Sequence, residues 1–184
     1  MVMMEWKKFG VICVLGLTLM AAAGCSDGSK NATSAGTPAT QQAQTTKPQG
    51  VEKTLYRKPK DGSQKLVAVK TTVQGDTAQQ QLETLKELVE KQPEGDKTFP
   101  KNLKVNKLTV KDGLATVDLS KEFLTRRAGE YDTTMMIYAL VNTLTEFPDI
   151  KKVTFTVNGE PVEVLGQMDM TTPFERNETF LPKA

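Results

Sequence analysis

The sequence predicts an α+β domain of two layers, in which an antiparallel sheet of hairpins carries two helices on one face. Three dipeptides that favour two-residue β-turns each separate two runs of alternating apolar and polar residues, and they are Asp61-Gly62, Asp112-Gly113 and Asn158-Gly159. Two longer segments between these hairpins repeat their apolar residues with the period of a helix. The predicted order is ββαββαββ, and helices between hairpins pack most simply on one face of an antiparallel sheet.

The N-terminal residues have the three parts of a bacterial export signal. Two lysines give a positive start, and the apolar run over residues 9–23 is short for a membrane-spanning helix, which needs about 20 apolar residues. Three small residues then precede Cys25, and this arrangement resembles the lipobox of bacterial lipoproteins. The resemblance implies that residues 1–24 are a lipoprotein signal peptide. It also implies that Cys25 carries lipid, with acyl chains such as palmitate, at the extracytoplasmic face of the cell membrane.

Two alternatives for this segment stay open, namely an ordinary secretory signal in which Cys25 is incidental and an uncleaved anchor helix. The only other cysteine, Cys13, lies in the apolar run and leaves with the signal, so we expect no disulfide in the mature chain. The true start of the chain is also open, since Met3 or Met4 would leave the signal intact.

Residues 25–50 are predicted to form a flexible, lipid-anchored linker. After the cysteine this segment has no aromatic or branched aliphatic side chain, so it cannot bury enough surface to order itself. The formal net charge of +2 lies entirely in residues 1–50, which leaves the predicted domain, residues 51–170, formally neutral. Such a domain has no basic excess for phosphate backbones, so nucleic acid is not an expected partner. Residues 171–184 are predicted to be a C-terminal tail.

The first helix is predicted to begin at Asp76, where Gln79 completes a capping box, and to end before Pro93 and Gly95. Its predicted buried stripe is Ala78, Leu82, Leu85, Leu88 and Val89. An exposed pair of opposite charge, Glu87 and Lys91, is expected at a spacing of four residues.

The second hairpin has a register that its turn predicts. The expected pairs are Val110 with Ala115, Leu108 with Val117, and Lys107 with Asp118. Leu103 and Val105 are out of phase with the later apolar residues, which predicts a bulge near Asn106.

The second helix is predicted over about residues 132–146, with Asp132 as its N-cap and with Met135 and Met136 in the core. Its predicted buried stripe is Ile137, Leu140, Val141 and Leu144.

In the third hairpin we expect Val153 opposite Val164 and Phe155 opposite Val162, and Pro161 indicates an edge strand. The outer face of the sheet is expected to be wet, with Thr109, Thr116, Thr154 and Thr156. Exposed strand edges leave an oligomer open, although lysine-rich strands and Pro161 protect against such pairing.

The sequence offers little catalytic chemistry. It contains no histidine, and neither cysteine remains as a free thiol, which excludes histidine-based triads, His-Glu zinc motifs and thiol nucleophiles. There is no glycine-rich phosphate loop and no calcium loop, so we expect no catalytic, cofactor or metal site. Arg126 and Arg127 could grip an anion, but paired arginines more commonly mark a solvated loop.

Carboxylates are the surviving alternative, because an envelope protein could use two of them to bind or hydrolyse peptidoglycan. The candidates are Asp118, Glu122, Glu130 and Asp132. Each also has an ordinary structural role: Asp118 faces Lys107, Glu122 follows a serine at a helix start, and Asp132 suits an N-cap.

Four segments together resemble the signature of the GerMN domain, which is named for sporulation and spore germination. These segments are residues 110–120 together with 122–123, 139–148, 153–159 and 161–162. The likeness extends over about residues 55–170, and the family's namesake has two such domains in tandem where this chain has one.

This resemblance implies a fold that contains the αββαβ order of the ring-building motif. It implies no known catalysis and no cofactor. The expected function is that of a non-enzymatic, lipid-anchored module for protein–protein interaction in the cell envelope. Its expected partners are the membrane, through the lipid on Cys25, and envelope or sporulation-complex proteins.

Overall fold

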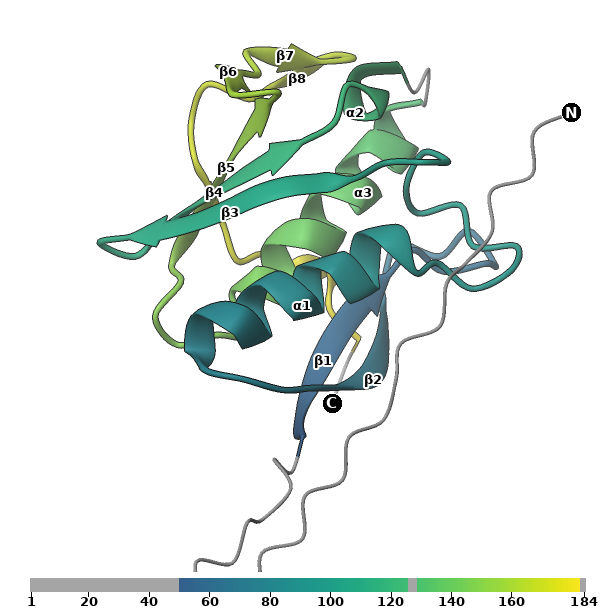
Figure 1. Cartoon of the computed structure of the whole chain (residues 1–184). Helices are drawn as coiled ribbons and strands as arrows, with labels where there is room; N and C mark the ends of the chain where they lie inside the picture. Colours follow the sequence, from purple (N-terminus) through teal and green to yellow (C-terminus); the bar gives the residue numbers. More distant parts are fainter. Residues whose placement is uncertain (1–49, 126–128, 183–184) are drawn as a thin grey trace, which may run out of the picture. The chain divides into compact units, whose positions relative to one another are not determined.

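Three β-hairpins and two long helices alternate along residues 50–125 and 129–182, the residues that the computed structural model describes (Figure 1). The hairpins are β1 (Val51–Arg57) with β2 (Val67–Val73), β3 (Val105–Lys111) with β4 (Leu114–Leu119), and β5 (Lys152–Val157) with β6 (Glu160–Pro161). The helices are α1 (Thr77–Glu90), the short α2 (Glu122–Thr125) and α3 (Glu130–Leu144). The strands β7 (Val164–Leu165), β8 (Met168–Asp169) and β9 (Phe174–Glu175) and the 3-10 turn η1 (Glu178–Phe180) follow. This arrangement confirms the predicted α+β class and the order ββαββαββ.

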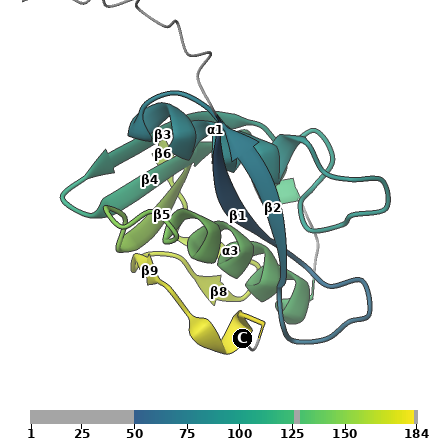
Figure 2. The ribbon, with the colours of Figure 1, turned by 90° about the horizontal axis from the view of Figure 1, so that it is seen from below.

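The hairpins are antiparallel as predicted, but they do not join in one antiparallel sheet. The strands β3, β4, β5 and β6 are neighbours in that order, and β9 pairs with β5. β4 and β5 run parallel, because the chain crosses from one to the other through α3 and parallel neighbours need such a crossover. The hairpin β1–β2 is a separate sheet that packs on α1 and α3, on the side of α1 opposite to β3 and β4 (Figures 1 and 2).

The second hairpin agrees with the sequence prediction pair by pair. Its turn residues have left-handed backbone angles, with φ of 51° at Asp112 and 83° at Gly113. The three predicted pairs are present, and the register shifts between Val105 and Lys107, which confirms the bulge near Asn106. A local turn signal was sufficient here because two residues fix the register of the whole hairpin.

The first hairpin does not close at Asp61-Gly62 with a two-residue turn. Arg57 pairs with Val67, so residues 58–66 form the connection. Leu66 explains the difference, since its side chain is buried in the core and its N–H donates to the Phe180 carbonyl over 2.7 Å. Contacts with the rest of the domain therefore set the length of this loop.

The third hairpin closes at Asn158-Gly159 as predicted, and Pro161 lies in the edge strand β6. The predicted pairing of Val153 with Val164 is wrong. Val153 pairs with Phe174 of β9, whereas Val164 pairs with Asp169 in the hairpin β7–β8. The edge of β5 beyond β6 is thus occupied by a segment from near the C-terminus.

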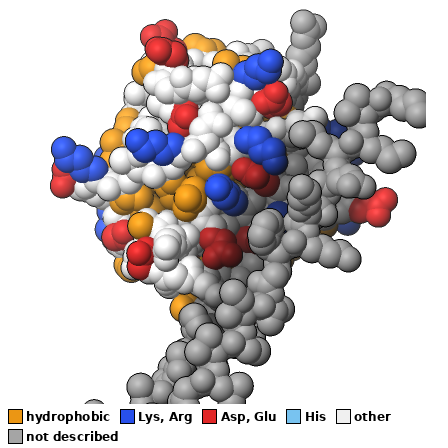
Figure 3. All heavy atoms as spheres, viewed as in Figure 1, with side chains coloured by type: hydrophobic (Ala, Val, Ile, Leu, Met, Phe, Trp, Pro, Cys, Tyr) orange, Lys and Arg blue, Asp and Glu red, His pale blue; other side chains and the backbone are white. Residues whose placement is uncertain are grey.

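The helix α1 begins with the predicted capping box. Asp76 accepts from the Gln79 N–H, and the Gln79 side chain accepts from the Asp76 N–H. Ala78 is exposed, so the buried stripe starts later than predicted, and Leu82 stays half-buried. Hydrophobic side chains reach the surface between α1 and β3 (Figure 3).

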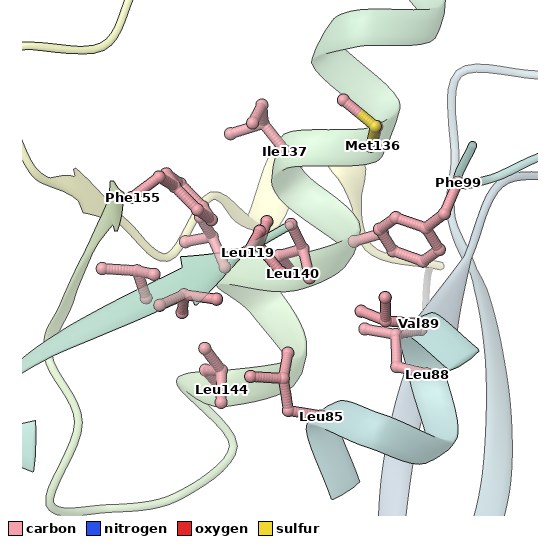
Figure 4. Packing of buried hydrophobic residues seen from close by; sticks show 14 of the residues in the cluster. Leu85, Leu88, Val89, Phe99, Leu119, Met136, Ile137, Leu140, Leu144 and Phe155 are labelled. Atoms are coloured by element: carbon pink, nitrogen blue, oxygen red, sulfur yellow. The ribbon is translucent and has the colours of Figure 1, made fainter. Parts of the chain in front are cut away.

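The helix α3 is the centre of the core and is buried on almost every side, as expected for a helix with apolar residues all round. Met135 and Met136 are each 1% exposed, which confirms that they pack in the core. Figure 4 shows Leu140 beside Leu119 of β4 and Leu144 beside Leu85 of α1.

The predicted N-cap of this helix is wrong, because α3 begins at Glu130 with Gly129 at the cap position. Asp132 instead lies in the first turn, where its carboxylate is 2.7 Å from the Lys58 ammonium. A partner from the β1–β2 loop therefore holds the side chain that the sequence assigned to capping.

Residues 171–182 belong to the predicted C-terminal tail, and they pack on the domain. Asn142 of α3, fully buried, donates to the Asn177 carbonyl over 3.0 Å and accepts from the Asn177 N–H over 2.9 Å. The rings of Tyr138 and Phe180 stack with centroids 4.6 Å apart. Within the described residues, no helix has the length and apolar character needed to cross a membrane.

Candidate interaction surface

Three residues to which the sequence assigns chemistry lie outside the described part of the chain. They are Cys25, the predicted lipidation site, and the paired Arg126 and Arg127. The signal segment and nearly all of the linker lie outside it as well. The predicted lipidation therefore stays a prediction from the sequence.

Asp118, the first of the candidate carboxylates, serves the fold. It accepts from the Thr156 hydroxyl over 2.9 Å and from the Gly159 N–H over 2.8 Å, so it ties β4 to the β5–β6 turn. Burial alone would raise the pKa of this carboxyl, but these hydrogen bonds and the charge of Lys107 hold the pKa below its ordinary value. A glycosidase acid needs the opposite shift, toward a raised pKa.

The other candidate carboxylates are placed at the starts of two helices. Glu122 of α2 accepts from the Ser120 hydroxyl over 2.5 Å, and this bond lowers the pKa of its carboxyl. Glu130 is exposed at the start of α3, and Asp132 is paired with Lys58. No group of three carboxylates or other metal-ligating side chains that could hold a metal ion occurs in the part of the chain that the structure describes.

The open edge of β3 is a more prominent feature of the surface. Asn158 donates to the Leu119 carbonyl on the β5 side of β4, so the even-numbered residues of β4 bond toward β3. Their partners in β3 are residues 107, 109 and 111. Leu108 and Val110 therefore direct their N–H and C=O groups away from β4, and no described residue bonds to these groups.

Beside this edge the surface is apolar and hollow. The side chains of Leu108 and Val110 point to the inner face, but at the edge of the sheet they stay half-buried, as does Leu82 of α1. A hollow of about 550 Å³ follows the same helix and is lined by Gln74, Gly75, Gln79, Leu82, Glu83 and Lys86. We call the apolar surface between α1 and the outer edge of β3 the α1–β3 groove (Figure 3).

Glu90 fixes the two walls of the groove at one end. Its carboxylate accepts from the Val105 N–H over 2.9 Å and lies 3.2 Å from the Lys104 ammonium. Burial would raise the pKa of this carboxyl, but these two partners outweigh it and lower the pKa. Glu83, Lys86 and Glu90 follow at helical spacing, so they lie on one face of α1.

Lysines border the groove. Lys107 and Lys111 are exposed on the outer face of β3, Lys86 is exposed on α1, and the Lys104 side chain is 61% exposed. The nearby carboxylate of Glu83 is engaged, since it accepts from the Gln74 N–H over 3.0 Å. Lys104 is paired with Glu90, whereas Lys86, Lys107 and Lys111 have no hydrogen-bonded carboxylate among the described residues.

The sequence predicted lysine-rich strand edges but did not predict the groove. The signal that could have indicated it is the pair of apolar residues Leu108 and Val110 in a strand of alternating lysines and threonines. The neighbour that completes the groove, α1, comes from a different part of the chain, and no local pattern predicts that contact.

Comparison with protein families gives one match that covers most of the chain. Residues 35–163 match the Germane family, which is described as "Sporulation and spore germination". No protein of curated function matches the chain at a significant level.

Solved structures with the same fold come from a sporulation protein. The first GerMN domain of the sporulation protein GerM from Bacillus subtilis has 26% identity and a TM-score of 0.57, over 68% of this chain and 98% of that one. The tandem GerMN domains of the same protein have 23% identity and a TM-score of 0.56, over 68% of this chain and 46% of that one. This chain thus spans about half the length of the tandem structure.

A crystal structure of a candidate lipoprotein from Clostridium perfringens has 23% identity, over 71% of this chain and 90% of that one. Its TM-score of 0.46 is too low to support a conclusion.

Proposed function

Because the chain belongs to the Germane family of sporulation and spore germination proteins, we propose that it is a lipid-anchored envelope protein that acts by binding protein partners during one of these processes. The family match over residues 35–163 carries this proposal. The match extends from within the predicted linker to the β5–β6 hairpin, so it includes both long helices and the α1–β3 groove.

Binding rather than catalysis is the role that the described side chains support. The sequence has no histidine, and the carboxylates of Asp118 and Glu122 have lowered pKa values and serve the fold. The groove offers apolar surface and free backbone groups, which are features of protein recognition.

The anchor part of the proposal rests on Cys25, which follows three small residues and an apolar run. Replacement of Cys25 by Ser removes the thiol that would take the lipid, and Cys13→Ser is the matched control within the apolar run. We expect fractionation to find the wild type and the Cys13→Ser chain in the membrane and the Cys25→Ser chain outside it. Mass spectrometry should find acyl chains on the Cys25 peptide, and an unmodified thiol on a membrane-bound wild type would contradict the anchor.

The partner part is tested by affinity purification from detergent-solubilised membranes of sporulating cells. We expect the tagged full chain to retain at least one envelope protein in stoichiometric amount. Recovery of the chain alone, under conditions in which it is folded by circular dichroism, would contradict a role through protein binding.

A further inference from the structure

We propose that the α1–β3 groove binds an extended segment of a protein partner as an added strand beside β3, and that this segment alternates apolar with acidic residues. The inference deepens the proposed function and rests on it, because it names the surface and the chemistry of the partner.

The backbone of β3 supplies the first requirement for an added strand. The N–H and C=O groups of Leu108 and Val110 point outward, and within the described residues they have no partner on that side. Two donors and two acceptors in register are what an extended segment pairs with when it joins a sheet edge. The edge is seven residues long and has its bulge at one end, near Asn106, so residues 107–111 remain regular.

Side chains around the groove determine which residues of the added strand face inward. Successive side chains of a strand point to opposite faces of the sheet, so every second one would lie on the inner face, toward α1. There it would meet Leu82, Leu108 and Val110, which are half-buried and apolar. Covering these groups from water favours apolar residues at the inward positions.

The remaining side chains of the added strand would lie on the outer face, beside Lys107, Thr109 and Lys111. Neither lysine has a hydrogen-bonded carboxylate partner among the described residues, although Asp118 lies opposite Lys107. Cross-strand pairs of opposite charge stabilise a sheet and like charges destabilise it. The outward positions therefore favour Asp and Glu.

Two other occupants of the β3 edge fit it less well. A second copy that paired its own β3 with this edge would bring Lys107 and Lys111 beside the lysines of its partner. The chain's own segment over residues 26–49 has one acidic residue, Asp27, and no aromatic or branched aliphatic residue, so it lacks both halves of the pattern. A strand from another protein fits the edge better than either.

The test uses the full chain in detergent and three labelled nine-residue peptides. The first alternates Val and Glu, the second has the same composition with the alternation scrambled, and the third alternates Val and Lys. We expect fluorescence anisotropy to show at least tenfold tighter binding of the alternating Val/Glu peptide than of either control. We also expect hydrogen exchange by NMR to show new protection of the Leu108 and Val110 amides.

Two variants separate the contributions of charge and backbone. The double substitution Lys107→Glu/Lys111→Glu should weaken the Val/Glu peptide about tenfold and favour the Val/Lys peptide instead. Lys60→Glu, at an exposed lysine of the β1–β2 loop, makes a single charge reversal away from the groove and should change neither affinity. Val110→Pro removes one outward N–H without touching the β4 ladder, as proline is tolerated at such edge positions, and it should weaken binding about tenfold.

The inference is overturned if the Val/Glu peptide does not bind, if the scrambled peptide binds equally, or if binding leaves the Leu108 and Val110 amides unprotected. It is also overturned if the double charge reversal leaves the peptide preference unchanged. If the full chain still retains an envelope protein from membranes in any of these cases, the groove is wrong and the proposed function stands. If the chain retains none, the proposed function fails independently of the groove.

Discussion

Arg57→Met tests how the hairpin β1–β2 is held against the end of α1. The Arg57 guanidinium is buried, with its side chain 9% exposed, and it donates to the Leu88 carbonyl and to the Asp96 carboxylate, each over 3.0 Å. Its other terminal nitrogen donates to the Glu87 carbonyl over 3.0 Å. Arg57 thus bonds carbonyls at the end of α1 that the helix itself leaves without partners.

The expected loss in the free energy of unfolding combines the broken ion pair with the removal of an unpaired nitrogen. Breaking a buried ion pair costs about 3–5 kcal/mol. Two features reduce this figure: the Arg57 Nε has no partner in the described structure, and Thr98 continues to donate to Asp96 over 2.7 Å and 2.6 Å after the substitution. Removal of the unpaired Nε returns about 1 kcal/mol. We therefore expect Arg57→Met to lower the free energy of unfolding by about 2–4 kcal/mol.

The matched variant is Asp96→Asn, which removes the charge of the partner but leaves Arg57 bonded to the helix carbonyls. We expect it to cost less than Arg57→Met, because the guanidinium stays bonded to the Leu88 and Glu87 carbonyls, which offset part of its unpaired buried charge. Urea unfolding followed by circular dichroism measures both, with the slope against urea unchanged. A loss below about 1 kcal/mol for Arg57→Met, or equal losses for the two variants, would refute the helix-end role of Arg57.

Three further substitutions test the core and the charges of the domain. The folded pKa of Asp118 lies below its ordinary value of 3.8, so its ionised form stabilises the fold above about pH 4, and this stability is lost as pH falls through the folded pKa. Asp118→Asn should therefore flatten the decline of the free energy of unfolding at acid pH, measured by urea titrations. An unchanged decline would contradict the role of Asp118. Asn142→Ala should lower the free energy of unfolding by about 1–3 kcal/mol, because it removes the two hydrogen bonds to the Asn177 backbone, and it should expose residues 171–182 to trypsin at Arg176. Resistance to trypsin equal to that of the wild type would show that these bonds do not hold the segment. Leu140→Ala should lower the free energy of unfolding by about 2–5 kcal/mol, since Leu140 is fully buried, and a loss under 1 kcal/mol by the same assay would place it outside the core.

Local signals account for the parts of the fold that the sequence predicted. The predicted register of the second hairpin was correct because Asp112-Gly113 fixes a two-residue turn. The predicted start of α1 was correct because Asp76 and Gln79 bond each other. Both features are decided by residues close together in the chain. The buried stripe of α3 was likewise predicted by helical spacing alone.

Long-range contacts account for the parts that the sequence did not predict. The β1–β2 loop is drawn onto the domain by Leu66, and Phe174 takes the place beside Val153 that the sequence assigned to Val164. The parallel pairing of β4 with β5 depends on where α3 crosses, which no turn signal encodes. The groove is of the same kind, because it needs α1 and β3 side by side.

Heat-resistant spore yield and germination rate in the native host measure the central claim most directly. The comparison uses a strain that lacks the gene and two complemented strains, one with the wild type and one with Cys25→Ser. The account predicts that the deletion lowers spore yield or slows germination, that the wild type restores it, and that the Cys25→Ser chain does not. Unchanged spores in the deletion strain would contradict a sporulation or germination role, and full rescue by Cys25→Ser would contradict the need for the anchor.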